Sequence, residues 1–306
     1  MNSNRKIRIA LIGLGDIAQK AYLPIVAAHQ EVQPVLCTRD EETLRQLAET
    51  YRIEEKYSDI DTLIAARPDA AMIHAASEAH HGLATKLLAA GIPIFVDKPL
   101  AYELAHTEEI LALAEAQNRA VYVGFNRRFA PLITSLGRHE DVFRVDWQKH
   151  RVAQPGEARS FVMDDFIHVL DGLRFLGGDP DGEVEVFCRK ANGLLEAIDV
   201  RWTSGNTLVT GSMNRVAGRA EEVVRVNAPN QTWTVRELSS GRHARGGEEA
   251  DMGFGNWTPT LAKRGFETMI EDWLAVAREG NFSLSAKQDI LATHALCEGV
   301  LGAIGD

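Results

Sequence analysis

Three side chains capable of acid–base chemistry recur at helical spacing in the segment FVMDDFIHVLDGLRFLGG, residues 161–178. Asp164, His168 and Asp171 are separated by four and three residues, so an α-helix would place them on one face. A neighbouring carboxylate raises the basicity of an imidazole and orients it for proton transfer. The spacing therefore predicts His168 as a general acid or base and Asp164 as its orienting carboxylate. Two alternatives are a solvated acidic edge with one hydrogen-bonded histidine and, less favoured, a metal site.

A lysine directly before a proline is the second candidate. The stretch IPIFVDKPLA, residues 92–101, is an apolar strand that ends at Asp97, Lys98 and Pro99. Ligands of open α/β sheets bind outside the carboxyl ends of the strands, which predicts that Lys98 points into a ligand crevice. By composition alone, a lysine at a strand end is usually a solvated charge.

The glycines near the N-terminus indicate what that crevice binds. In IALIGLGDIA, residues 9–18, Gly13 and Gly15 follow an apolar strand, and Asp16, Ile17 and Ala18 begin a helix. Such glycines permit a tight turn and let backbone N–H groups approach a pyrophosphate at the positive end of the helix. The pattern GxGxxA is weak by itself, but after the first strand of a βαβ unit it predicts a dinucleotide-binding turn.

The end of the second strand bears on which dinucleotide is bound. An NAD site places Asp or Glu there to accept from the ribose 2′-OH, whereas the 2′-phosphate of NADP requires a cation. The sequence reads VLCTRD, with Thr38 in the usual acidic position and Arg39 after it. We therefore expect NADP, with NAD still possible because Asp40 could serve the ribose and Arg39 could be a solvated cation.

The elements that must position these residues alternate strand and helix through the first third of the chain. Apolar strands alternating with helices are typical of a doubly wound parallel sheet covered on both faces. The predicted strands are 7–13, 32–38, 69–76, 92–99 and 120–125, and the predicted helices are 16–29, 41–51, 80–91 and 104–118.

After Gly178 the periodicity changes to the alternation of an antiparallel sheet with one packed and one exposed face. The glycine-rich, charged stretch 242–256 is expected to be a mobile loop, followed by helices over 257–280 and 287–303. The predicted fold class is α/β, with a dinucleotide-binding domain over 1–123 and an α+β domain with an open, mostly antiparallel sheet over 124–306.

Composition excludes several classes of function. The 306 residues have a formal net charge of -10, which argues against a nucleic-acid-binding surface. Apolar runs are too short for a membrane span, and the N-terminus lacks the apolar core of a signal peptide, so a cytoplasmic protein is expected. The three cysteines are far apart and in no metal-binding spacing, and no metal ion is expected.

Several motifs together resemble the Gfo/Idh/MocA family of NAD(P)-dependent oxidoreductases. They are GLGDIA, AASEAHHGLATKLLAAGIPIFVDKPLA with His80, VGFNRRFAP, DDFIHVLD and RGFETMIEDWLAVAREG, and they cover nearly the whole chain. The sequence looks most like the branch named after the virulence factor MviM.

The resemblance implies site residues as well as a fold. The family's Glu-Lys-Pro lysine falls on Lys98 and its Asp-x-x-x-His pair on Asp164 and His168. Further positions implied to bind cofactor are His80, Asp97 and, in the segment that leads into the second domain, Asn126. The sequence departs from the family's pattern at two places: Asp97 replaces the usual glutamate, and HAAS, residues 74–77, replaces the usual loop beside the nicotinamide.

The expected function is hydride transfer between a nicotinamide cofactor and a hydroxyl or carbonyl of a small polar substrate, a sugar or cyclitol. The alternatives are a cofactor-binding regulatory protein without turnover and a glycosidase that uses bound NAD. In multi-subunit relatives the exposed face of the sheet buries against its counterpart, so a homodimer or homotetramer is expected.

Overall fold

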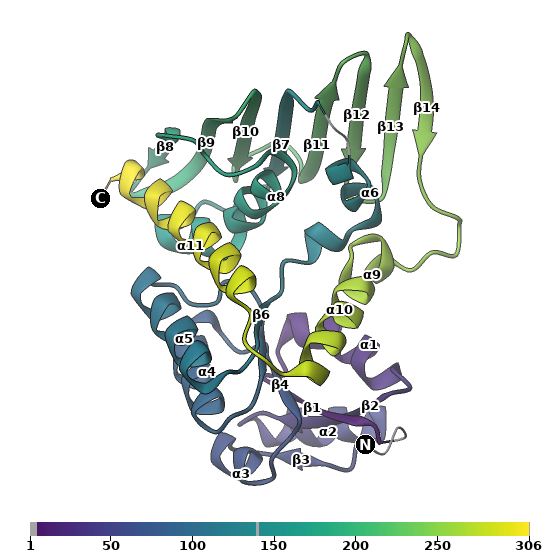
Figure 1. Ribbon diagram of the computed structural model, residues 1–306, viewed down its shortest axis with the longest axis vertical. Coiled ribbons are helices and arrows are strands. Elements are labelled where there is room, and N and C mark those ends of the chain that lie inside the picture. Colours follow the sequence, from purple (N-terminus) through teal and green to yellow (C-terminus); the bar gives the residue numbers. More distant parts are fainter. Residues whose placement is uncertain (1–4, 139–140, 306) are drawn as a thin grey trace. The chain divides into compact units, whose positions relative to one another are not determined.

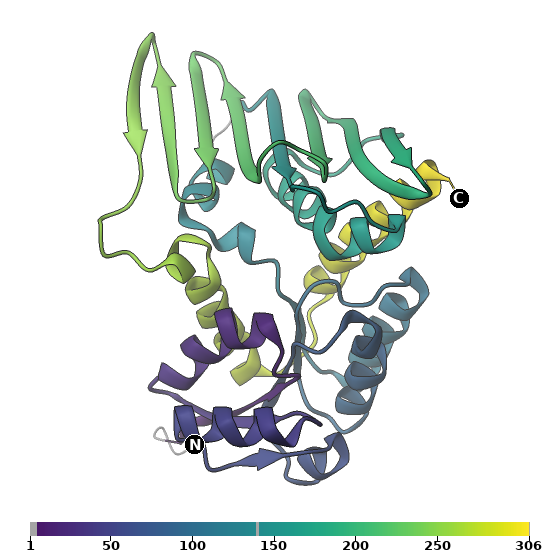
Figure 2. The same ribbon diagram turned by 180° about the vertical axis from the view of Figure 1, so that it is seen from behind.

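The computed structural model describes residues 5–138 and 141–305, and the chain forms two compact units (Figures 1 and 2). The first unit comprises Met1–Gly124 and Glu267–Leu291, and the second comprises Phe125–Phe266 and Ala292–Asp306. The domain prediction, 1–123 and 124–306, did not include this return of the chain to the first unit. Helical periodicity shows which face of a helix is buried, but not which part of the chain covers it.

The first unit contains a six-stranded parallel sheet in the order β3-β2-β1-β4-β5-β6. This is the strand order of a dinucleotide-binding fold. The chain adds β2 and β3 on one side of β1 and then β4, β5 and β6 on the other, so the order of the strands reverses between β1 and β4. The doubly wound prediction is confirmed; the short β3 was not predicted. The strands are β1 (Ile7–Ile12), β2 (Val32–Cys37), β3 (Lys56–Tyr57), β4 (Ala70–Ile73), β5 (Ile94–Val96) and β6 (Val121–Val123).

Helices cover both faces of this sheet (Figure 1), and its strands are therefore buried on both sides. The predicted helix 16–29 contains a π-helical turn, Ala18–Tyr22, that leads into α1 (Leu23–Ala28). The others in this unit are α2 (Glu41–Tyr51), α3 (Ile60–Ala65), α4 (His80–Ala89), α5 (Leu104–Gln117) and nearly all of α10 (Phe266–Glu279).

Helix α10 completes the core of the first unit. Its Trp273 is fully buried, with ring centroids 5.9 Å from Phe95 on β5 and 5.8 Å from Tyr122 on β6. The Tyr122 hydroxyl donates a hydrogen bond of 2.8 Å to Asp272 on the same helix. These contacts explain why the late helix belongs to the unit that the N-terminal residues begin.

The second unit contains an eight-stranded sheet in the order β14-β13-β12-β11-β7-β10-β9-β8. Among the described strand pairings of this eight-stranded sheet, only that of β7 with β10 is parallel, so the predicted mostly antiparallel sheet is confirmed. The strands are β7 (Arg144–His150), β8 (Glu185–Ala191), β9 (Leu194–Ser204), β10 (Thr207–Asn214), β11 (Glu221–Ala228), β12 (Gln231–Arg236), β13 (Ser240–Arg245) and β14 (Glu248–Met252).

One face of this sheet is covered by α8 (Ile167–Gly177), which packs against β7 and β10 (Figure 1). The approach is close enough that a Cβ added at Gly172 of α8 would lie 2.2 Å from the Trp147 ring on β7. Glycine at this position therefore sets the distance between helix and sheet.

Preceding α8 are α7 (Ala158–Phe161) and a π-helical turn, Val162–Phe166. The unit also contains α6 (Pro131–Thr134), α9 (Thr260–Lys263) and the end of α11 (Leu284–Ile304).

The prediction of a mobile loop over 242–256 was wrong for most of its length. These residues form the β13–β14 hairpin at one edge of the sheet (Figure 2). Its turn contains Gly246 and Gly247, both with positive φ, as a tight hairpin turn requires. Both strands are largely exposed, so they lack the apolar alternation that predicts a strand. Main-chain pairing of β13 to β12 and of β14 to β13 determines their conformation. No helix in the described chain is long and apolar enough to cross a membrane.

Candidate active site

The glycine turn after β1 has the geometry that a pyrophosphate requires. Gly13 adopts φ +83°, and a Cβ there would lie 2.5 Å from the backbone nitrogen of Ala75. A Cβ added at Gly15 would meet no atom within 4 Å, so the backbone at this turn faces open space. Two glycines that leave the backbone uncovered in front of a helix N-terminus fit a dinucleotide phosphate group.

The three residues that follow the turn have different environments. Ala18 is fully buried, which permits close packing of the helix on the sheet, as the third position of the motif requires. Ile17 is partly exposed, and the Asp16 carboxylate forms an exposed ion pair of 2.6 Å with Lys20. Direct contact of Asp16 and Ile17 with a cofactor therefore stays a prediction.

The end of β2 is followed by an exposed cation, Arg39, and by a carboxylate, Asp40, that is hydrogen-bonded within the protein. Thr38 is half-buried and Arg39 is exposed, with no acceptor for its guanidinium among the described residues. Asp40 is the N-cap of α2, where its Oδ1 accepts a hydrogen bond of 3.0 Å from the Thr43 N–H. That hydrogen bond lowers the pKa of the Asp40 carboxyl, so the alternative ribose acceptor already has a structural role.

Lys98 lies two residues after Val96, the last residue of β5, and is half-buried; it thus stands at the carboxyl end of this strand, as predicted. The preceding Asp97 is held in place by two hydrogen bonds. Its N–H donates to the Ile73 carbonyl at the end of β4 (2.9 Å), and its Oδ1 accepts from the Tyr22 hydroxyl (2.8 Å). The peptide bond between Lys98 and Pro99 is cis. Asp97 thus orients the strand end that presents Lys98.

His80 lies between the two loops that follow β4 and β5. Its side chain is 1% exposed, with Nδ1 2.8 Å from the Pro99 carbonyl oxygen and Nε2 3.0 Å from the Ala75 carbonyl oxygen. Both ring nitrogens thus face backbone carbonyls. This arrangement supports a positioning role, in which His80 connects the Lys98 loop to the residues packed against Gly13, and direct contact with cofactor stays a prediction.

His74, which sequence reasoning left without a role, is buried at the end of β4. Its ring stacks on Tyr22 with centroids 4.0 Å apart, and neither ring nitrogen has a hydrogen-bond partner among the described residues. Burial, with a smaller effect of His80, lowers the pKa of His74 to about 3. It is therefore a neutral packing residue beneath the glycine turn.

The predicted acid–base pair lies in the second unit, at a change of helix type. Asp164 belongs to the π-helical turn and His168 to α8, and both side chains are half-buried. A π-turn is wider than an α-turn, so the face predicted from 3.6-residue spacing is altered at this point. Asp171 is 1% exposed and accepts hydrogen bonds from Arg128 (2.9 and 2.5 Å) and Thr293 (3.2 Å). It therefore has a structural role within this unit.

Asn126, at the start of the second unit, is buried. Its Nδ2 donates a hydrogen bond of 2.9 Å to the Arg264 carbonyl, next to Gly265 with φ +79°. The amide thus holds the turn before α10. Of the predicted site residues, Gly13 to Ala18, Thr38, Arg39, His80, Asp97 and Lys98 belong to the first unit, and Asn126, Asp164 and His168 belong to the second.

Family models match both parts of the chain. Residues 7–125 match the Gfo/Idh/MocA model, described as an oxidoreductase family with an NAD-binding Rossmann fold, and residues 136–246 match the YceM-like C-terminal domain. A curated relative named YceM, from Salmonella typhimurium, is 32% identical over 269 residues, which cover 86% of each protein. The chain belongs to the Gfo/Idh/MocA family of oxidoreductases.

Solved structures of Gfo/Idh/MocA proteins share the whole fold. A family oxidoreductase from Vibrio cholerae has a TM-score of 0.92 at 38% identity, and the MviM dehydrogenase from Clostridium difficile has 0.91 at 26%. Both comparisons cover 98% of this chain and all of the other. An inositol 2-dehydrogenase from Arthrobacter is 25% identical over 242 residues, 72% of this chain and 69% of that protein. The predicted family, its MviM-like character and an NAD(P)-binding Rossmann unit are confirmed.

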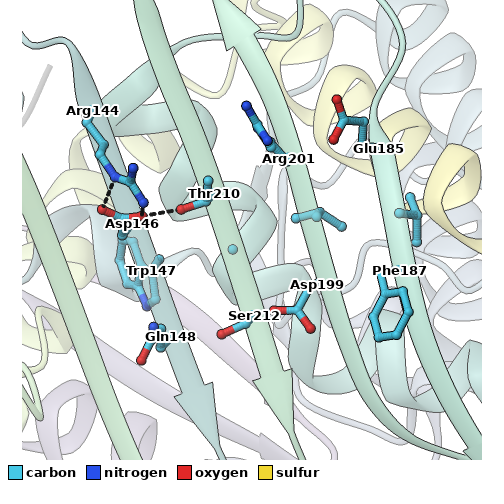
Figure 3. A pocket seen from close by; sticks show the side chains of 13 residues that line it. Arg144, Asp146, Trp147, Gln148, Glu185, Phe187, Asp199, Arg201, Thr210 and Ser212 are labelled. Atoms are coloured by element: carbon cyan, nitrogen blue, oxygen red, sulfur yellow. Dashed lines mark hydrogen bonds and ion pairs between the residues drawn. The ribbon is translucent and has the colours of Figure 1, made fainter.

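Outside the positions that the Gfo/Idh/MocA motifs predict, two further groups of side chains stand out. A depression on the outer face of the eight-stranded sheet is lined by residues of four strands, among them Arg144, Asp146, Arg201 and the exposed Phe187 (Figure 3). In the first unit, side chains of His81, His106 and Glu109 have possible ligand atoms within 4.8 Å of one another. Sequence spacing missed this second group because α4 and α5 contribute to it jointly.

The sequence reasoning also missed a buried ionic cluster around Asp165. This carboxylate accepts hydrogen bonds from Lys149, Arg151 and Arg215. The partners come from β7, the loop after it and the end of β10, up to 50 residues away in the chain. The only sequence signal was Asp165 itself, beside the predicted Asp164.

Proposed function

We propose that this oxidoreductase transfers a hydride between NADP(H) and a carbon that carries a hydroxyl or carbonyl group in a small polar substrate, a sugar or cyclitol. The observation that carries the proposal is Lys98, presented at the carboxyl end of β5 in the unit that contains the glycine turn. The Asp164–His168 pair of the second unit and the inositol 2-dehydrogenase among the relatives support it.

In the direction of alcohol oxidation, His168 accepts the proton of the substrate hydroxyl, while the hydride leaves the carbon that carries this hydroxyl. Lys98 stabilises the negative charge that develops on the oxygen, and Asp164 orients the imidazole. A bound nicotinamide supplies the hydride acceptor, and the donor in the reverse direction. The reverse reaction returns the proton from His168 to the carbonyl oxygen.

The preference for NADP(H) is supported by the end of β2. Arg39 offers an exposed guanidinium for a 2′-phosphate, and Asp40, the nearest carboxylate in sequence, caps α2. NAD remains the alternative that the cofactor experiment below distinguishes.

A panel of sugars, inositols and their oxidised forms, followed by NADPH absorbance, tests the proposed reaction. We expect turnover with at least one member and much lower turnover in Lys98→Met. A panel without turnover, in a protein that still binds cofactor, would favour a regulatory protein. Cofactor that copurifies, with glycoside hydrolysis and no net oxidation, would favour a glycosidase.

We further propose a homo-oligomer in which the outer face of the eight-stranded sheet pairs with a second copy. The side chain of Phe187 supports this, because it is 72% exposed on that face. A cytoplasmic location is proposed because the three cysteines are free, as expected in a reducing compartment.

A further inference from the structure

One carboxylate in the second unit receives three positive side chains. The Asp165 oxygens accept from Arg151 Nε (3.0 Å) and Nη2 (3.1 Å), from Arg215 Nη2 (3.2 Å) and from Lys149 Nζ. A carboxylate has about four lone-pair positions, so these four hydrogen bonds saturate it. Asp165 has no capacity left for the remaining N–H groups of its three partners.

Those remaining donors are numerous and partly buried. Arg215 Nε is buried and has no hydrogen-bond partner among the described residues, and of the guanidinium only Nη2 donates to Asp165. The Lys149 side chain is 4% exposed, and its ammonium has three N–H donors but one carboxylate partner. Unpaired buried donors cost free energy, which makes this cluster incomplete without a further acceptor.

The neighbouring charges do not compensate for the surplus. Arg127 forms a bidentate pair with buried Glu222, at 2.6 and 3.0 Å, and the indole of Trp147 donates to the same carboxylate. That pair is internally balanced, whereas three basic side chains share the one carboxylate of Asp165. The nearby carboxylate of Glu237 belongs to an exposed residue and accepts from the backbone of Glu222.

The electrostatics of the cluster agree with this count. Burial and the charge of Arg127 lower the pKa of Lys149 to about 7, although Asp165 and Glu222 act in the opposite direction. Burial alone would raise the pKa of the Asp165 carboxyl, but Lys149 and Arg151 hold it well below its usual value. The carboxylate is thus strongly stabilised, whereas for the ammonium the cost of burial and the charge of Arg127 outweigh the attraction of Asp165 and Glu222.

The position of the cluster connects it to the proposed chemistry. Asp165 follows Asp164 and precedes His168 by three residues. The Arg151 side chain is 38% exposed, so the cluster has a solvent-accessible member. Residues three apart on a helix lie about 5–6 Å apart at Cβ, so a small molecule whose reacting carbon lies at His168 is long enough to extend toward Asp165 and its partners.

We propose that Lys149, Arg151 and Arg215 bind an anionic oxygen group of the substrate, a carboxylate or a phosphate, beside Asp165. The substrate class would then be an acidic sugar or cyclitol, such as a sugar acid or a sugar phosphate. Guanidinium groups bind both kinds of oxygen anion through parallel N–H donors. This inference rests on the proposed oxidoreductase function and specifies its substrate.

Calorimetry on the NADP⁺-saturated protein tests the inference, because saturation removes phosphate binding at the cofactor turn. The probes are two matched sets: glucose, glucuronate and glucose 6-phosphate, and myo-inositol with myo-inositol 1-phosphate. We expect at least one acidic member to bind about tenfold or more tightly than its neutral partner, the scale of one charge-assisted hydrogen bond. A carboxylate preference and a phosphate preference are separate outcomes that both support the site. The inference is overturned when no acidic probe binds more tightly than its neutral partner.

Variants locate the binding. Lys149→Met and Arg215→Gln are expected to reduce the affinity for the acidic probe about tenfold or more and leave that for the neutral probe unchanged. Arg144→Gln is the matched control, since Arg144 lies on the outer face of β7 and pairs with Asp146 (Figure 3). Unchanged acid binding in both cluster variants would overturn the assignment. Arg151→Gln, at an accessible side chain, provides the same test should Lys149→Met fail to fold.

The two proposals fail in different ways. Turnover of a neutral sugar, with no preference for its acidic analogue, contradicts the anion site and leaves the oxidoreductase function intact. Tight binding of an acidic probe that depends on Lys149 and Arg215, with no hydride transfer to any tested compound, supports the site and contradicts the proposed function.

Discussion

At the scale of single residues, the two units divide the proposed chemistry between them. Lys98 comes from the first unit, at a strand end that Asp97 and Tyr22 orient, and His168 comes from the second. Neither residue is fully buried, so substitutions there should affect function more than stability.

Lys98→Met tests the contribution of charge at the end of β5. The methionine has similar length without the ammonium, so turnover should fall by about two orders of magnitude or more while the fold is retained. Steady-state kinetics on a substrate from the panel, with circular dichroism to verify folding, provides the measurement. Activity close to that of the wild type would mean that the charge of Lys98 does not contribute to turnover and that its side chain only fills space.

His168→Asn tests the acid–base assignment. Loss of the proton acceptor should lower turnover by roughly 10²–10⁴-fold and remove one limb of the pH–rate profile. Binding of NADPH, followed by its fluorescence, should be unchanged because the glycine turn belongs to the other unit. A pH profile that retains both limbs would contradict the assignment.

Thr38→Asp tests the cofactor. A carboxylate at this position would accept from a ribose 2′-OH and repel a 2′-phosphate, so the preference should change from NADP(H) to NAD(H). Calorimetric titration of both cofactors into wild type and variant measures the change. Tighter binding of NAD(H) by the wild type would contradict the proposed preference.

At the scale of elements, the strands of the first unit other than the short β3 were predictable because both of their faces are apolar, a pattern that short sequence windows contain. The positions of the glycine turn and of Lys98 at the ends of these strands were predictable for the same reason, and the roles of these residues stay predictions. The β13–β14 hairpin was not, since exposed edge strands have no such pattern. The Asp165 cluster was missed because its partners meet only after β7 and β10 pair. The π-helical turn at Asp164 also lacks a sequence signal, so spacing alone does not give the orientation of Asp164 relative to His168.

The core beneath the glycine turn gives a prediction about pH. His74 stays neutral in the folded protein because burial lowers its pKa to about 3, whereas the unfolded chain takes up a proton below about pH 6.5. The contribution of neutral His74 to the free energy of unfolding is therefore fully present above about pH 6.5 and is lost as the pH falls toward 3.

Comparison with His74→Phe isolates this effect. Relative to the variant, the wild type should lose about 2 kcal/mol of free energy of unfolding between pH 7 and pH 5. Urea denaturation of both proteins at the two pH values measures the difference, and any constant effect of the larger ring on packing cancels. An equal pH dependence in the two proteins would mean that the folded His74 accepts a proton.

At the scale of the whole molecule, the outer face of the eight-stranded sheet is the surface we propose for self-association. Phe187→Glu places a charge on that face and should shift the protein toward monomers, which light scattering after size exclusion detects. Val216→Glu is the control, because Val216 is also exposed but lies after β10, outside the sheet. Identical mass for wild type and Phe187→Glu at every concentration would contradict the proposed interface.

The return of α10 to the first unit has a consequence for how the protein is made. During translation, residues 1–124 leave the ribosome long before Trp273, which packs against Phe95 and Tyr122. The nascent sheet therefore exposes an apolar surface while the 142 residues from Phe125 to Phe266 are synthesised. An N-terminal fragment released at that stage would be a substrate for chaperones or proteases, and the first unit reaches its native core only after Trp273 has been synthesised.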